Sequence, residues 1–374
     1  MLSPTEFLRH LQDHDVTFFT GVPDSLLKEF CACIAQNVSP AMHVIAANEG
    51  GAVALGIGYH MATGKLPLIY LQNSGLGNTI NPLLSLSDPE IYSIPMILLI
   101  GWRGGPGGKD EPQHKKQGRV TLSLLETLGI PYSVLDASMD NAEAAIAEAV
   151  TTARAQLAPY ALVVRNGTFD YHPVSTDERR YPMQREDAIK LLVNALGERD
   201  IVVSTTGMLS RELFEFRDIL GQSHQQDFLT IGGMGHASQI ALGIAMQKPE
   251  RQVICLDGDG SVLMHLGSLA INGTSGCTNF KHIVINNGAH DSVGGQPTVA
   301  QQVDLASTAR ALGYQYAVST RAPQELIQQL RAFRETAGPA LLEIMVDKGN
   351  RPDLGRPTVH PLQNKQRFQE FVRT

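Results

Sequence analysis

The sequence is short of charge, and the charge that it carries is acidic on balance. Charged residues make up 18% of its 374 residues, and the formal net charge is −7. A deficit of basic side chains disfavours a surface that binds nucleic acid or an anionic membrane. It also means that an anionic substrate would need basic residues gathered in one place.

Long hydrophobic runs are missing as well, and we expect no secretory leader. No stretch reaches the roughly 18 apolar residues of a transmembrane helix, and the first residues lack the apolar core of a secretion signal. The four cysteines, Cys31, Cys33, Cys255 and Cys277, show no metal-binding or redox spacing. We therefore expect reduced thiols and a soluble protein of the cytoplasm.

Apolar side chains and glycine, by contrast, are abundant. The chain is 43% hydrophobic and has 35 glycines, and its length suits two well-buried domains. Short apolar runs alternate with helical patterns in both halves, which predicts an α/β fold of two doubly wound parallel-sheet domains. We place them at residues 1–170 and 185–374. Residues 171–184 contain prolines and charges without an apolar period, so we interpret them as the linker.

The two halves also share a short repeat. The tetrapeptide Ala-Leu-Gly-Ile occurs at residues 54–57 and again at 241–244, each time ahead of a strand with a glycine-containing polar tip. A match of four residues is weak by itself. The shared order of helix, strand and glycine nevertheless indicates two copies of one architecture.

The end of one predicted strand carries residues that are suited to bind a diphosphate. The apolar run 253–256 ends in Gly258-Asp259-Gly260, and a helix is expected over residues 262–271. Glycines allow the backbone to approach a ligand closely, Ser261 adds a hydroxyl, and a helix begins with free N–H groups. The sequence therefore predicts diphosphate binding at Gly258, Gly260 and Ser261.

The same tips offer hard oxygen ligands. A second apolar run, 283–285, ends in Asn286-Asn287, and the carboxyl ends of parallel strands meet at the sheet edge where ligands bind. Asp259, Asn287 and the backbone carbonyl of Ala289 would supply part of an octahedral shell for Mg²⁺. We expect a magnesium site there.

The spacing of the tips, Gly-Asp-Gly and then Asn-Asn after 25 further residues, resembles the thiamine diphosphate fingerprint of the 2-oxo acid decarboxylase and acetolactate synthase superfamily. The resemblance implies thiamine diphosphate and Mg²⁺ as cofactors. It also implies a pyrimidine-binding domain at residues 1–170, a diphosphate-binding domain at 185–374, and active sites at the interface of a homodimer or a dimer of dimers. Two unrelated glycine-closed turns are the alternative.

Other residues match the same superfamily. Glu49 matches the carboxylate that activates the aminopyrimidine ring, and its small apolar neighbours would raise its pKa. Met234 matches the apolar residue beneath the cofactor, and Thr206 and Gly207 lie where the family contacts it. The alternatives are that Glu49 is an ordinary first-turn glutamate favoured by the helix dipole, that Met234 is a core methionine and that Thr206 is a helix N-cap.

At the substrate end, Ser25, Asn73 and Ser74 match positions that line the pocket in related decarboxylases. The chain departs from the common pattern at Asp24, where many relatives have glycine, and it lacks a pair of catalytic histidines near Asn73. Protonation of the intermediate after CO₂ loss would then come from another loop histidine. The candidates are His114 and His290, although lone loop histidines are more often solvated.

Basic residues crowd one glycine-rich segment, 104–118, which has no apolar period and is expected to be a mobile loop over the site. Such a cluster would hold a substrate with a second anionic group, and Arg103 at the strand end is the best candidate because arginine makes forked contacts. The other members are Lys109, His114, Lys115, Lys116 and Arg119. A solvated loop is the alternative for the lysines.

A second glycine-rich segment, 288–298, looks like a lid over the substrate, with Ser292 among its contacts. Together with the segments 19–27, 101–104 and 110–114, it resembles the phosphonopyruvate and sulfopyruvate decarboxylases. The resemblance implies decarboxylation of 3-phosphonopyruvate to phosphonoacetaldehyde in phosphonate biosynthesis, with sulfopyruvate decarboxylation as the close alternative.

Three other classes of protein make different demands on the sequence. An acetolactate synthase-like carboligase would share Glu49, Asp259 and Asn287 but would need room for a second oxo acid. A non-catalytic subunit of this fold would be expected to lose those three residues. A plain nucleotide-binding protein would need a Rossmann glycine fingerprint after the first strand, which is absent.

Overall fold

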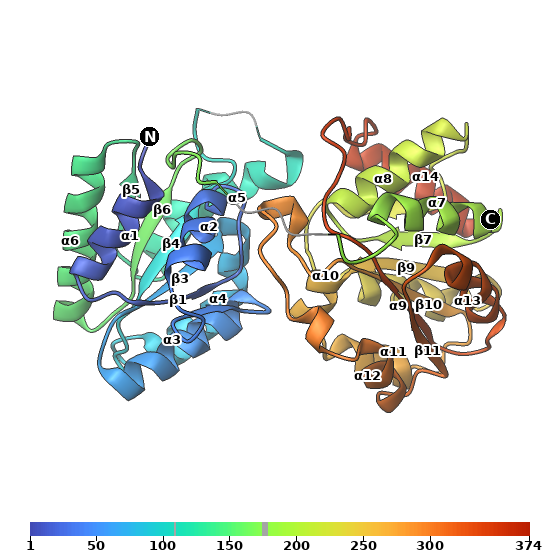
Figure 1. The fold of residues 1–374 in the computed structure, drawn as a ribbon, viewed down its shortest axis with the longest axis horizontal. Coiled ribbons are helices and arrows are strands. Elements are labelled where there is room, and N and C mark those ends of the chain that lie inside the picture. Colours follow the sequence, from blue (N-terminus) through green and yellow to red (C-terminus); the bar gives the residue numbers. More distant parts are fainter. Residues whose placement is uncertain (108–109, 174–178) are drawn as a thin grey trace. The chain divides into compact units, whose positions relative to one another are not determined.

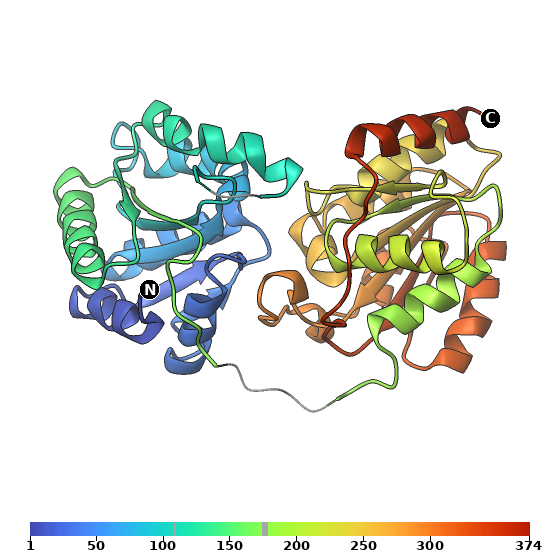
Figure 2. The same cartoon turned by 90° about the horizontal axis from the view of Figure 1, so that it is seen from above.

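The computed structural model describes residues 1–107, 110–173 and 179–374, which form two compact units, Met1–Thr176 and Asp177–Thr374. Each unit contains one six-stranded sheet in which every strand pair is parallel. Helices cover both faces of each sheet (Figures 1 and 2). The predicted fold class, two doubly wound parallel α/β domains, is confirmed. Of the proposed linker, residues 174–178 lie outside the described residues.

The first unit has the strand order β2-β1-β3-β4-β6-β5. Its elements are α1 (Pro4–Asp13), β1 (Phe18–Gly21), α2 (Lys28–Asn37), β2 (His43–Ile45), α3 (Glu49–Thr63), β3 (Pro67–Gln72), α4 (Leu76–Pro82), β4 (Ile97–Gly101), α5 (Pro112–Thr127), β5 (Tyr132–Leu135), α6 (Met139–Gln156) and β6 (Tyr160–Val164).

The second unit has the strand order β11-β12-β10-β9-β7-β8. Its elements are α7 (Arg185–Ala195), β7 (Ile201–Ser204), α8 (Met208–Ile219), β8 (Asp227–Leu229), α9 (Ala237–Gln247), β9 (Val253–Gly258), α10 (Asp259–Met264), α11 (Ser268–Thr274), β10 (Phe280–Asn286), α12 (Leu305–Ala311), β11 (Tyr316–Thr320), α13 (Pro323–Glu335), β12 (Ala340–Met345) and α14 (Pro361–Arg373).

The two sheets have the same topology. Read from β8, the second sheet has the order β8-β7-β9-β10-β12-β11, which repeats the order of the first sheet strand for strand. The matching Ala-Leu-Gly-Ile tetrapeptides lie on the equivalent helices α3 and α9, each of which precedes a central strand. The predicted repetition of one architecture is therefore confirmed.

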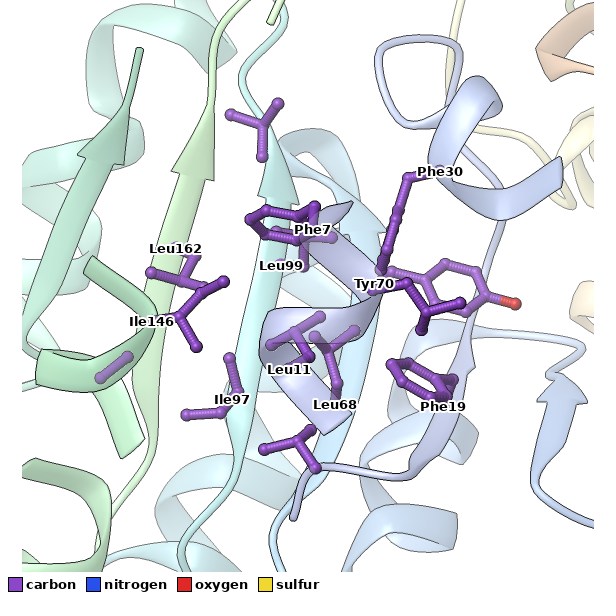
Figure 3. Close-up of a cluster of buried hydrophobic side chains, with 14 of the residues drawn as sticks. Phe7, Leu11, Phe19, Phe30, Leu68, Tyr70, Ile97, Leu99, Ile146 and Leu162 are labelled. Atoms are coloured by element: carbon purple, nitrogen blue, oxygen red, sulfur yellow. The ribbon is translucent and has the colours of Figure 1, made fainter. Parts of the chain in front are cut away.

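Both faces of the first sheet are buried, which explains why its strands are almost wholly apolar. On β3, Leu68 and Tyr70 pack into one core with aromatic residues of α1 and α2, whereas Ile69 and Leu71 pack into a second core on the opposite face. Figure 3 shows the first of these cores, which includes Phe7, Phe30 and Tyr70; the Phe7 and Phe30 rings meet edge to face with their centroids 5.2 Å apart. Rigid packing on both faces fixes the positions at which the strands end.

Two local predictions were wrong. The segment 104–118 is not all loop, because α5 begins at Pro112 and continues through Gly118. Proline suits the first turn of a helix, since its missing N–H has no partner there anyway. The single helix expected over 262–271 is instead the two short helices α10 and α11, separated by three residues in which His265 leaves the helical conformation. The elements α4, β8 and α14 were not predicted.

All four cysteines are free thiols, and three of them are buried. Along the described part of the chain, no helix is both long enough and apolar enough to cross a bilayer.

We predict that Gly118→Ala destabilises the protein. A Cβ at residue 118 would lie 1.8 Å from the carbonyl oxygen of Gly104, so the strand end and α5 would have to separate. We expect a loss of about 2–4 kcal/mol, typical of overpacking and backbone displacement, measured by thermal or urea unfolding. Gly58→Ala on α3 is the control, because a Cβ there meets nothing within 4 Å; it should gain up to about 1 kcal/mol. Equal stability of Gly118→Ala and the wild type would contradict the close contact.

Candidate active site

Each sheet carries polar residues at its carboxyl edge. In the first unit, Glu49 begins α3 after β2, Asn73 follows β3, and Arg103 follows β4. In the second unit, Asp259 follows β9 and Asn287 follows β10. The strand ends therefore bring together, within each unit, residues that are far apart in sequence.

Glu49 is a buried carboxylate with few partners. Its side chain is 5% exposed, and its Oε2 accepts a hydrogen bond of 2.7 Å from Nδ2 of Asn78 on α4. The other oxygen lies against Gly75, where a Cβ would come within 2.3 Å of Oε1. Burial raises the pKa of the Glu49 carboxyl, in the direction expected from its small apolar neighbours.

Asn73 links the ends of two neighbouring strands through hydrogen bonds. Its amide nitrogen donates to the carbonyl of Arg103 at 2.8 Å and to the hydroxyl of Thr121 at 2.9 Å, and its Oδ1 accepts from the backbone N–H of Arg103. Both amide hydrogens are thus used inside the protein. Asn73 joins β3, β4 and α5 rather than presenting donors to a ligand, whereas Ser74 is exposed and accepts from Gln72.

Arg103 is held by a carboxylate of its own unit. Its Nε and NH2 donate to the two oxygens of Asp110 at 2.9 and 2.5 Å, and NH1 donates to Oγ of Ser25 at 2.6 Å. The geometry is a forked pair of the kind that arginine makes with carboxylate, phosphate and related anions. Ser25 and Arg103, two predicted substrate residues, are therefore in direct contact.

Asp24, the departure from the common pattern, lies beneath this pair. Its side chain is fully buried, Oδ2 accepts from the backbone N–H of Leu26, and Oδ1 has no partner among the described residues. Burial raises the pKa of Asp24 to about 6, against the lowering effect of that N–H and of the nearby Arg103 charge. The first unit thus places a buried acid next to its only forked arginine pair at this edge among the described residues.

His114 lies on α5 rather than in a loop. It is buried, its Nδ1 has no partner among the described residues, and burial lowers its pKa, with the Arg103 charge acting in the same direction. The predicted basic residues Lys115, Lys116 and Arg119 are exposed on the same helix. Lys109 lies outside the described residues.

In the second unit, Ser261 joins the predicted diphosphate-binding segments. Its hydroxyl lies 3.0 Å from Oγ1 of Thr205 at the end of β7, and it accepts from the backbone N–H of Gly235 at 3.0 Å. The residue at the end of β7 that contacts Ser261 is Thr205, and the cofactor contact expected of Thr206 stays a prediction. Gly207 has φ of 102°, a conformation that requires glycine.

Asp259 is 3% exposed at the beginning of α10, and its Oδ2 accepts a hydrogen bond of 2.5 Å from the Thr298 hydroxyl. Burial raises the pKa of Asp259 to about 6, although the Thr298 hydrogen bond lowers it. Gly258 and Gly260 flank this carboxylate, as predicted from the sequence. A buried carboxylate with one side-chain donor has lone pairs left for another ligand.

Asn287 is fixed by its neighbours. Its Nδ2 donates to Oδ2 of Asp291 at 2.7 Å, and its Oδ1 accepts from the backbone N–H of Ala289 at 3.1 Å. The same Oδ2 of Asp291 accepts from the buried Arg185.

The predicted lid, residues 288–298, is closed on itself. Thr298 N–H donates to the carbonyl of Gly288, and His290 N–H donates to that of Gln296. The His290 ring lies near Gly260, where a Cβ would come within 3.1 Å of Cε1 of the ring and within 3.3 Å of Cε of Met234. Burial lowers the pKa of His290 to about 4. Met234, His290 and the Gly258–Gly260 turn thus gather in one place, and the exposed Ser292 lies near Gly207.

Sequence reasoning missed several residues that act through hydrogen bonds. These are Asn78, Asp110, Thr205, Arg185 and Asp291. Asp110 and Asp291 do lie in motifs that carried the resemblance, and that was the available signal. Their partners, however, are set by tertiary structure.

Known proteins match the chain along its whole length. Residues 5–121 match the family "Thiamine pyrophosphate enzyme, N-terminal TPP binding domain", and residues 205–344 match "Thiamine pyrophosphate enzyme, C-terminal TPP binding domain". The chain is 34% identical to phosphonopyruvate decarboxylase of Streptomyces viridochromogenes, over 100% of this chain and 96% of the relative. It is also 34% identical to phosphonopyruvate decarboxylase of Streptomyces hygroscopicus, over 100% and 94%.

A sulfopyruvate decarboxylase of Methanosarcina acetivorans is 28% identical, over 94% of this chain and 92% of the relative. The resemblance drawn from the strand tips is thus confirmed by relatives of nearly equal length and by both domain families. The chain belongs to the family of thiamine diphosphate-dependent decarboxylases that includes phosphonopyruvate decarboxylase.

Proposed function

We propose that the protein decarboxylates 3-phosphonopyruvate to phosphonoacetaldehyde and CO₂, with thiamine diphosphate and Mg²⁺, as a step of phosphonate biosynthesis. The observation that carries the proposal is Glu49, a buried carboxylate with a raised pKa at the sheet edge, held by one hydrogen bond from Asn78. A buried carboxyl group with a raised pKa is better suited than a solvated one to accept and return a proton.

The residues of the second unit fit the proposed cofactors. Asp259 and Asn287 contribute hard oxygen atoms from adjacent strand ends, and the carbonyl of Ala289 is the third proposed ligand of Mg²⁺. Gly258, Gly260 and Ser261, together with Thr206 and Gly207, are the proposed contacts to the diphosphate side of the cofactor. The lack of a side chain at Gly260 leaves space that Met234 and His290 border.

Thiamine diphosphate supplies an electron sink for the carbon–carbon bond that breaks. Glu49 would hold the aminopyrimidine ring by a hydrogen bond and would exchange a proton with it, and Met234 would support the cofactor rings. Burial lowers the pKa of both His290 and His114, and these two rings are the groups that would hold or move a proton at the reaction site.

Arg103 binds the second anionic group of the substrate. In the structure its fork is filled by Asp110, and Ser25 takes the remaining direction. A phosphonate has oxygens in the arrangement that the fork recognises, so it replaces Asp110 rather than meeting a free cation. The buried acid Asp24 lies near enough to Arg103 for its negative charge to raise the pKa of the guanidinium, after the larger effect of Asp110.

Sulfopyruvate decarboxylation is the second candidate. A sulfonate presents similar oxygens to Arg103, and the sulfopyruvate decarboxylase of Methanosarcina acetivorans matches nearly the whole chain. The difference between the two anions is charge, because a phosphonate can carry two negative charges at neutral pH and a sulfonate carries one.

The function is tested by CO₂ release from the purified protein with thiamine diphosphate and Mg²⁺, using phosphonopyruvate, sulfopyruvate and pyruvate at equal concentration. We expect kcat/KM to be highest for phosphonopyruvate, because the charge and fork of Arg103 favour the dianion. Preference for sulfopyruvate would support the second candidate, and release from none of the three would contradict decarboxylation.

The same comparison on Arg103→Lys shows whether Arg103 carries the preference. Lysine keeps the charge but loses the fork, so KM for phosphonopyruvate should rise about tenfold or more while activity with pyruvate changes little. Arg9→Lys on α1 is the matched control, because Arg9 is an exposed arginine that also donates to a carboxylate, that of Asp13; it should behave as the wild type. An equal loss with all three substrates would argue against contact between Arg103 and the second anion.

We predict that Glu49→Gln binds thiamine diphosphate but loses about 10²–10⁴-fold in kcat, because the amide cannot exchange the proton. Cofactor affinity is measured by calorimetric titration and turnover by CO₂ release. Glu6→Gln is the control, since Glu6 is an exposed glutamate in the first turn of α1 and feels the same helix dipole. Turnover of Glu49→Gln at the wild-type rate would leave Glu49 as an ordinary first-turn glutamate.

A further inference from the structure

One buried oxygen in the second unit accepts hydrogen bonds from three different segments. Oδ2 of Asp291 receives Nδ2 of Asn287 at 2.7 Å, NH1 of Arg185 at 2.9 Å and the backbone N–H of Gly349 at 2.9 Å. The Asp291 side chain is only 9% exposed. A carboxylate oxygen that accepts three donors is tightly held, and so are the donors.

This contact fixes the orientation of the Asn287 amide. An ionised carboxylate only accepts hydrogen bonds, so the group that Asn287 turns toward Asp291 must be its NH₂. On the other side, the backbone N–H of Ala289 only donates, so the atom 3.1 Å away must be Oδ1. Two independent constraints therefore agree, and the carbonyl oxygen of Asn287 faces away from Asp291.

Asp291 is itself anchored. Arg185, on α7, donates to Asp291 through NH1 and to both oxygens of Glu212, on α8, through Nε and NH2 at 2.9 Å each. The Arg185 and Glu212 side chains are 5% and 2% exposed. A charge-paired group buried to this degree has little freedom to move, because separating any member would leave an unpaired charge in the interior.

We infer that Asp291, anchored by Arg185 and Glu212, is a positioning residue that holds the amide oxygen of Asn287 toward the Mg²⁺ site. Asp291 acts through Asn287 and does not touch the metal. The inference rests on the proposed function in one respect, the role of Asn287 as a metal ligand. Partners that hydrogen-bond to a ligand typically change metal affinity by 10–100-fold when removed.

The competing interpretation is a structural clasp. Asp291 and Arg185 both contact Gly349, so they could serve only to fasten the chain after β12. A clasp lowers the stability of the fold when it is removed, but it leaves the affinity of the folded protein for metal unchanged. Metal affinity of the folded protein is therefore the quantity that separates the two roles.

The chain contains a matched control. Asp200, just before β7, is buried to a similar degree, with its side chain 8% exposed, and its Oδ2 accepts from Arg334 and from the backbone N–H of Gly197. It therefore shares the arginine and the glycine N–H of Asp291 but lies at the amino end of its strand, away from the carboxyl edge that carries Asn287. Asp200→Ala removes the same kind of clasp without touching a proposed ligand.

The test is direct titration of Mn²⁺ in the presence of thiamine diphosphate and without substrate, with free Mn²⁺ followed by electron paramagnetic resonance. We expect Asp291→Ala to weaken Mn²⁺ binding 10–100-fold relative to the wild type, and Asp291→Asn, which keeps one acceptor oxygen, to recover part of the loss. Asp200→Ala should lower the melting temperature and bind Mn²⁺ within about twofold of the wild type.

Wild-type affinity in Asp291→Ala would overturn the inference. If that variant does not fold, Glu212→Gln decides, because it loosens Arg185 without contacting Asn287: weaker Mn²⁺ binding supports the inference, and unchanged binding overturns it. Failure of the wild type itself to bind Mn²⁺ would instead refute the proposed metal site. The inference about Asp291 would then be refuted as well, and this outcome is seen with the wild type before any variant is compared.

Discussion

Burial of acidic side chains at the carboxyl edge of a parallel sheet is the constraint on which the rest of the structure depends. Glu49 and Asp259 are 5% and 3% exposed, and burial raises the pKa of both. A buried carboxylate is costly unless hydrogen bonds or charges compensate it. Each carboxylate has one side-chain donor, Asn78 or Thr298, and keeps lone pairs unused by the side chains around it. Such incomplete satisfaction is what a site for a further ligand requires.

The two sheets have the same topology, but the residues that accompany the buried carboxylate at the carboxyl edge differ between them. In the first unit the edge carries Glu49, a buried acid with a raised pKa, and the forked ion pair of Arg103 with Asp110. In the second unit the edge carries the side-chain oxygens of Asp259 and Asn287, and a network of hydrogen bonds through Asp291 and Arg185 supports Asn287. The repeated architecture therefore supplies the same edge twice, and the residues at the strand ends determine what each edge can bind.

The fold was largely readable from the sequence because both faces of each sheet are buried. Strands such as β6 and β7 are continuous apolar runs flanked by polar or turn-forming residues. The errors came from ambiguous signals. Pro112 and Gly118 suggested a loop, yet proline starts α5 and glycine lets α5 approach Gly104. The break between α10 and α11 at His265 was not predicted from the residues that follow Asp259.

The site was readable only where a motif fixes both residue type and position. Asp259 and Asn287 follow from strand ends and spacing, whereas the contacts of Arg103 with Asp110 and of Arg185 with Asp291 depend on tertiary structure. Arg185 and Asp291 are separated by 106 positions, and no local pattern connects residues so far apart. Asn73 shows the opposite case, since its position was predicted but its amide serves to join strands.

The most direct test of this arrangement is a crystal structure of the protein with thiamine diphosphate and Mn²⁺ bound. We predict anomalous density for one metal ion in contact with the side-chain oxygens of Asp259 and Asn287, with Asn287 still donating to Asp291 and the diphosphate beside Gly258 and Gly260. A metal ion coordinated by other residues, or an Asn287 amide turned away from the ion, would contradict it.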